Sequence, residues 1–153
     1  MNEEKKEFLK FKFIPLLQRL HAPDKGSWGV MNAQQMVEHF ADAVKNASGS
    51  LVLPVLNEGD TLAKYREFLM TETPFRENTK NPLMSEEPAA LRQPDMESAI
   101  NKLQAELDNF FNVYDANSSL TNNNPFFGEL NYEQQVQLLY KHAQHHLEQF
   151  GLI

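Results

Sequence analysis

The chain has 153 residues, of which 41% are hydrophobic and 23% charged, and its 14 basic and 21 acidic residues give a net charge of -7. This composition is typical of one globular domain with a buried core, so we expect a single domain over residues 1–153. The negative charge repels phosphate backbones, so nucleic acid is not expected as a partner. With no membrane-length apolar run, no signal-peptide layout and no cysteine, we expect a cytoplasmic protein without a membrane partner, a disulfide or a thiolate ligand.

The first half of the chain predicts three helices. The opening stretch "EEKKEFLKFKFIPLLQRL" is rich in apolar residues and predicts a helix that kinks or restarts at Pro15, because proline interrupts a regular helix. Asn32, with Gln35 three positions later, is typical of a capped helix start, and Gly49 is typical of a helix end. A third helix is expected over about 59–72.

The second half predicts one long loop and two long helices. Residues 73–94 hold four of the eight prolines, and an irregular stretch of this length is usually functional or disordered. Apolar residues at helical spacing predict helices over 95–117 and 131–150, with Gly151 ending the last one. Residues 118–130 show no strand pattern and are expected to be a loop. We therefore predict an all-α fold, an antiparallel four-helix bundle with a kinked first helix.

Three of the five histidines lie in "HAQHH", on the last expected helix. His39 lies seven residues beyond Asn32, and His142 and His146 lie eleven and fifteen beyond Asn131. At about 100° per residue, the three side chains point from similar sides relative to their helix starts. Facing helices can share one ion between inward side chains, and an i, i+4 pair is close enough to do so. Three imidazoles would leave a coordination position open, as in a reactive site.

The same residues are compatible with a purely structural role. His142 and His146 lie at the margin of the apolar stripe on their helix, which suits a cleft mouth or plain solvent exposure. His145 lies nearly opposite that stripe and is expected at the surface. An i, i+4 pair is weak evidence by itself, so a metal site and a core-edge His39 beside an exposed cluster both stay open. Asp42 is either an acceptor that orients the imidazole of His39 or a solvated carboxylate.

Two stretches, "WGVMNAQQMVEHFADAVKNASG" and "NPFFGELNYEQQVQLLYKHAQHHLEQFGL", resemble the DinB-like superfamily, and more narrowly a branch of unknown function within it. The resemblance implies a four-helix bundle that holds a divalent metal ion through one histidine on the second helix and an H-x-x-x-H pair on the fourth. Those positions are His39, His142 and His146. The resemblance also implies a homodimer and relatives that are thiol-dependent transferases or isomerases. Zinc, nickel and iron all suit imidazole ligands.

Two main hypotheses for function follow. The first is a metal-dependent transferase, isomerase or hydrolase that acts on a small molecule, with the ion as a Lewis acid or as the activator of water or a thiol. The second is a bundle that binds a metal or a partner without catalysis; a relative that has lost its metal is a third possibility. Residues 73–94, with Arg76, Lys80 and Arg92, are either a cover over the metal cleft that receives an anionic substrate or an ordinary connection.

Overall fold

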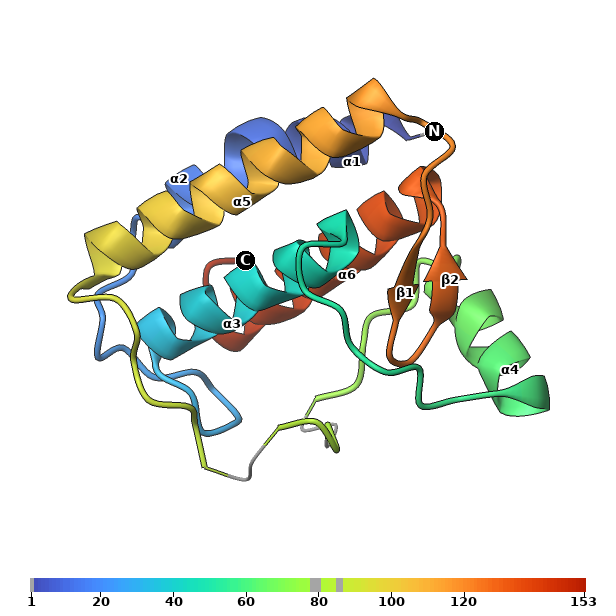
Figure 1. Cartoon of the computed structure of the whole chain (residues 1–153). Coiled ribbons are helices and arrows are strands. Elements are labelled where there is room, and N and C mark those ends of the chain that lie inside the picture. Colours follow the sequence, from blue (N-terminus) through green and yellow to red (C-terminus); the bar gives the residue numbers. More distant parts are fainter. Residues whose placement is uncertain (1, 78–80, 85–86) are drawn as a thin grey trace.

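The computed structural model describes residues 2–77, 81–84 and 87–153, and these residues are mostly helical (Figure 1). The elements in chain order are α1 (Glu3–Glu7), a π-helix (Phe8–Lys12), α2 (Phe13–Leu17), α3 (Ala33–Ser48), α4 (Gly59–Leu69), α5 (Met96–Ala116), β1 (Asn122–Asn124), β2 (Gly128–Leu130) and α6 (Tyr132–Gln149). The predicted helical character is confirmed. Within the described part of the chain, no helix is both long and apolar enough to cross a membrane.

The first helical segment, α1 to α2, contains a π turn rather than a break. The backbone N–H of Phe13 donates to the carbonyl of Phe8, five residues earlier. Pro15 has no N–H, and its ring would crowd the carbonyl of Phe11, four residues before it, in a regular helix. A π turn widens the backbone just ahead of the proline, and such turns are a common cause of helix distortion. The irregularity predicted at Pro15 is therefore present, and it lies one turn earlier.

The main hydrophobic core lies between the α1–α2 segment, α3, α5 and α6. In Figure 1 the α1–α2 segment and α5 run together along one side, with α3 and α6 on the other. Phe13, Phe40 and Phe110 are fully buried in this core. Burying such a side chain contributes about 1.5–3 kcal/mol. The hydroxyl of Tyr114 on α5 also donates to the carbonyl of Ala47 at 2.8 Å, which ties α5 to the end of α3.

Residues 118–130 correct the prediction of an all-α chain, because they include an antiparallel pair of short strands. Asn123 of β1 lies opposite Glu129 of β2. The guanidinium of Arg66 on α4 donates to the carbonyls of Phe127 and Glu129, so α4 holds this hairpin. Asparagine is uncommon in strands, so the three asparagines of β1 did not indicate a strand. A second, smaller core joins α4, the hairpin and α6 through Leu69, Phe127, Leu130 and Leu138.

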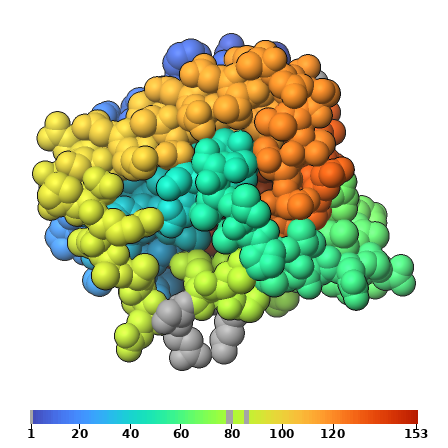
Figure 2. Space-filling model, in the orientation of Figure 1, coloured from blue at the N-terminus to red at the C-terminus, as the bar shows by residue number. Residues whose placement is uncertain are grey.

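The stretch 73–94 is irregular wherever it is described, as predicted, and both of its ends pack on the helices. Near its start, Phe75 packs against the second core. Near its end, the backbone N–H of Arg92 donates to the carboxylate of Glu38 on α3 at 2.7 Å. Figure 2 shows the end of this stretch, in yellow-green, beside the blue of α3. Lys80, one of the three cations predicted here, lies outside the described residues.

Candidate metal centre

Two capping boxes set the starts of the helices that supply the histidines. The side chain of Asn32 accepts from the N–H of Gln35, and the side chain of Gln35 accepts from the N–H of Asn32. Asn131 and Gln134 form the same pair of bonds at the start of α6. A side-chain cap of this kind stabilises a helix by about 1 kcal/mol. Both predicted starts are confirmed, so the helical positions used to compare the histidines are correct.

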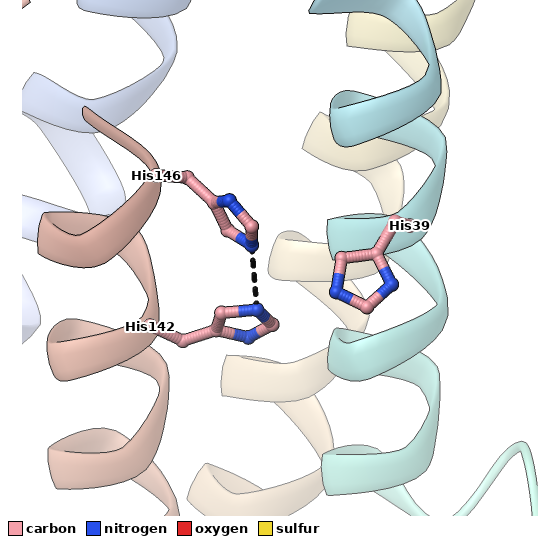
Figure 3. Close-up of side chains that lie close together, drawn as sticks. All are labelled: His39, His142 and His146. Atoms are coloured by element: carbon pink, nitrogen blue, oxygen red, sulfur yellow. Dashed lines mark hydrogen bonds between the residues drawn. The ribbon is translucent and has the colours of Figure 1, made fainter. Parts of the chain in front are cut away.

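The three predicted ligands come together. His142 and His146 point from α6 toward His39 on α3 (Figure 3). One ring nitrogen from each of the three histidines lies within 4.8 Å of the other two. The Nε2 atoms of His142 and His146 are 2.8 Å apart, and the ring of His39 lies 5.2 and 5.5 Å from those two rings, centre to centre. The sequence-based expectation that these side chains face one another is met.

Burial keeps the three imidazoles neutral. His146 is only 4% exposed, and His39 and His142 are half-buried. Burial lowers the pKa of His39, although the nearby carboxylate of Asp42 opposes the shift. Burial and the neighbouring histidines hold the pKa of His142 well below its usual value, and burial lowers the pKa of His146 to about 3. Neutral imidazole is the form that coordinates a metal, so the lone pairs are available at neutral pH.

The donor set fits a divalent transition-metal ion. Imidazole nitrogen suits zinc, nickel and iron, and zinc binds it at about 2.0–2.1 Å. The three nitrogens lie within 4.8 Å of one another, so the point midway between them is less than 4.8 Å from each nitrogen. The three rings would therefore have to turn toward this centre to bind one ion. Two helices supply the ligands, His39 from α3 and the pair from α6, so an ion here would also join the two helices.

His145 is not the surface residue that was predicted. It is half-buried, and its ring centre lies 5.6 Å from that of Trp28 and 6.5 Å from that of Phe75. Burial lowers the pKa of His145, and a hydrogen bond with the backbone of Phe75 opposes that shift. The covering residues come from two distant loops, which a helical projection of α6 cannot reveal. His145 remains outside the cluster of three nitrogens, as expected.

Asp42 does not orient His39 in the way proposed from the sequence. Its two carboxylate oxygens accept from the guanidinium of Arg92 at 3.1 and 3.0 Å, and among the described residues it makes no hydrogen bond to His39. Its effect on that histidine is electrostatic, because its charge raises the pKa. Besides its ion pair with Asp42, Arg92 has its Nε 3.5 Å from a carboxylate oxygen of Glu38. The guanidinium of Arg92 is thus paired with two carboxylates of α3, and it is not positioned to bind an anionic substrate.

Gln149 contacts the cluster and was not predicted from the sequence. Its Oε1 lies 2.7 Å from Nδ1 of His146, and its Nε2 donates to the backbone carbonyl of Trp28 at 2.8 Å. An amide three residues after a histidine is a common pattern and gave no signal. Glu38, next to His39 on α3, is buried as well and accepts from the end of the irregular stretch.

The fold and the site define a mostly helical protein with three converging histidines that are able to hold a metal ion. Residues 62–151 match the DUF1569 family, which is described as a protein of unknown function. Because the match spans more than half of the chain, the chain belongs to this family. The matched range includes His142 and His146 and begins after His39. A search of curated proteins and a search of solved structures each found no match.

Proposed function

We propose that His39, His142 and His146 bind one divalent metal ion, and that the chain is a DinB-like antiparallel four-helix bundle with the ion between its second and fourth helices, α3 and α6. The observation that carries the proposal is the convergence of three ring nitrogens, from two helices, within 4.8 Å of one another. The low pKa values caused by burial support it, because they favour the unprotonated rings that a metal requires.

We further propose that the ion serves a small-molecule reaction, as a transferase, isomerase or hydrolase. Three protein ligands leave at least one coordination position for a substrate, and an ion in such a site acts as a Lewis acid. The side chains of Trp28 and Phe75, which flank His145 beside the histidine cluster, provide apolar surface for a small organic molecule. Zinc, nickel and iron are all candidates for the ion.

The alternative is a bundle that binds a metal or a partner without catalysis. One observation favours it: the two carboxylates next to His39 on α3 are already engaged. Glu38 accepts hydrogen bonds from the backbone of Arg92 and Gln93, and Asp42 accepts from the guanidinium of Arg92. Neither carboxylate is therefore poised as a general base, which a hydrolase would need near the ion.

Metal content tests the first part of the proposal. Protein purified without a histidine tag, incubated with zinc, nickel or ferrous iron and then desalted, should retain one ion per chain. His146→Ala should abolish retention, and His145→Ala is the matched control because it removes the adjacent histidine of the same helix. A free metal concentration of 100 times the dissociation constant should also raise the free energy of unfolding by about 2.7 kcal/mol. Equal losses in the two variants, or no retained ion in the unmodified chain, would overturn the assignment.

Replacing the metal with cobalt(II) tests the hypothesis of a catalytic site against that of a non-catalytic bundle. Cobalt(II) has visible absorption bands that change with its ligands, so a small thiol or other substrate that enters the open position should alter the spectrum. A spectrum that stays unchanged across small thiols and carboxylates would favour the non-catalytic bundle. The same spectra are recorded for the His145→Ala variant, because that substitution widens the space beside Trp28 without removing one of the three proposed metal ligands.

We also propose a homodimer, on the basis of the sequence resemblance. The abundance of phenylalanine gives this proposal little support, because ten of the eleven phenylalanines are at least partly buried, nine of them in the two cores, and only Phe11 is exposed. Phe11, at 70%, and Val52, at 85%, are the most exposed large hydrophobic side chains in the described part of the chain. A single sedimenting species near 17.6 kDa at micromolar concentration would contradict the dimer.

A further inference from the structure

The side chain of Gln149 lies between His146 and the loop that precedes α3. Its Oε1 is 2.7 Å from Nδ1 of His146, and its Nε2 is 2.8 Å from the backbone carbonyl of Trp28. Gln149 is 3% exposed, so both contacts are shielded from water. A buried amide with partners on both sides has one preferred orientation.

The direction of each hydrogen bond follows from the chemistry of the partners. The carbonyl of Trp28 can only accept, so the nitrogen of the Gln149 amide must face it, and the amide oxygen must face His146. An amide oxygen also only accepts, so Nδ1 of His146 carries the hydrogen. A neutral imidazole has one N–H, so Nε2 of His146 carries no hydrogen and has a lone pair that can accept a hydrogen bond. That Nε2 is the atom that faces His142 at 2.8 Å, so Nε2 of His142 donates to it.

The loop over residues 26–29 is shaped around this amide. A Cβ on Gly26 would lie 2.8 Å from Cγ of Gln149, and a Cβ on Gly29 would lie 2.8 Å from its Nε2, which are distances that real Cβ atoms do not show. Gly29 also has a φ of 81°, which disfavours other residues. The N–H of Ser27 donates to the carbonyl of Gln149 at 2.7 Å. The two glycines therefore leave room for the side chain of Gln149, and the loop holds this residue through one hydrogen bond to its amide and one to its backbone.

We propose that Gln149 is a positioning residue that fixes His146 as the Nδ1–H tautomer and directs its Nε2 lone pair at the centre of the three histidines. Its importance for metal affinity rests on the proposed function, whereas the tautomer is a property of the metal-free chain. Groups that hydrogen-bond to the far nitrogen of a ligating histidine commonly change metal affinity 10- to 100-fold when they are removed. Gln149 occupies that place for His146, and the loop at 26–29 holds it there.

The experiment measures the tautomers directly. Long-range proton–nitrogen NMR spectra of the metal-free chain should show the hydrogen on Nδ1 of His146 and on Nε2 of His142. Gln149→Leu, which keeps the volume and removes the acceptor, should abolish the preference for Nδ1–H and weaken zinc binding about 10- to 100-fold. Gln149→Glu keeps an oxygen for His146 and should retain the Nδ1–H tautomer. The Gln149→Glu variant also provides a test of the tautomer if the Gln149→Leu variant does not fold.

Gln137→Leu is the matched control, since it makes the same substitution on the same helix at a similarly buried position. Gln137 donates to the carbonyls of Leu69 and Thr71 and accepts from Lys5, and within the described part of the chain it has no hydrogen bond to a histidine. It should change neither the tautomers nor zinc affinity. A hydrogen on Nε2 of His146 in the unmodified chain would overturn the proposal, as would a Gln149→Leu chain with unchanged tautomers and affinity. An unmodified chain with the Nδ1–H tautomer that binds no metal would support the role of Gln149 and overturn the metal proposal.

Discussion

Replacing Glu38 with alanine tests whether the end of the irregular stretch covers the histidine cluster. One carboxylate oxygen of Glu38 accepts from the N–H of Arg92 at 2.7 Å, and the other accepts from Gln34 at 3.2 Å and from the N–H of Gln93 at 3.4 Å. The side chain is 6% exposed, so water does not replace these bonds in the folded chain. Removing it should release the backbone at Arg92 from α3, although Gln34 still donates to the carbonyl of Gln93.

The expected magnitude follows from the shortest of these bonds. A hydrogen bond to a buried charged group contributes about 1.5–3 kcal/mol, and each 1.4 kcal/mol is a tenfold change in an equilibrium. Hydrogen exchange at the amide of Arg92 should therefore be about 10- to 150-fold faster in Glu38→Ala, if exchange follows local opening. If the segment covers the histidine cluster, the rate at which a bound ion dissociates should rise as well.

Asp42→Ala is the control, because Asp42 pairs with the same arginine at a more exposed position. Exposed ion pairs contribute about 0–1 kcal/mol, so exchange at Arg92 should change at most about fivefold. Unchanged exchange at Arg92 in Glu38→Ala would refute the structural reasoning. Faster exchange with an unchanged dissociation rate for the ion would show that the stretch is an ordinary connection.

Three further outcomes are expected. Gly26→Ala should displace Gln149 and weaken zinc binding by about tenfold in calorimetric titration, and unchanged affinity would argue against the packed loop. Tyr114→Phe should lower the free energy of unfolding in urea by about 1–2 kcal/mol without changing metal affinity, because it removes the buried bond to Ala47. Burial puts the folded pKa of His146 at about 3, below the value of 6.5 for an unfolded histidine, so the unfolded chain binds more protons below pH 6.5. The stability of the metal-free chain should then fall by about 1.4 kcal/mol per pH unit below 6.5 on account of this residue, and equal urea midpoints at pH 7 and pH 5 would contradict this.

The convergence of the three histidines could be predicted because local interactions set their positions. Asn32 and Asn131 each begin a helix through a bond that spans three residues, and such bonds can be read directly from the sequence. Once the starts are known, the regular rise and rotation of a helix fix where the side chains point. His39 and the pair on α6 therefore follow from information within a few turns of each residue.

The features that the sequence did not predict depend on partners far along the chain. The hairpin that includes Asn122–Asn124 is held by Arg66, about 60 residues earlier. Asp42 pairs with Arg92, and His145 packs against Trp28 and Phe75, which belong to separate loops. Helical periodicity describes which residues share a face, but it does not say which loop will cover that face. The sequence therefore predicted that the three histidines face one another, but it did not predict the solvent exposure and hydrogen-bond partners around them.

The family match covers only part of the candidate site. Residues 62–151 contain His142, His146 and Gln149, but the third histidine and the carbonyl that orients Gln149 lie before residue 62. Phe40 of α3, whose ring lies 4.8 Å from that of His142, also comes from the earlier part. Without α3 and the loop before it, the α6 pair would lose the burial that keeps it neutral and the bond that sets its tautomer. The histidine pair on α6 thus forms the proposed metal site only when the first third of the chain packs against it.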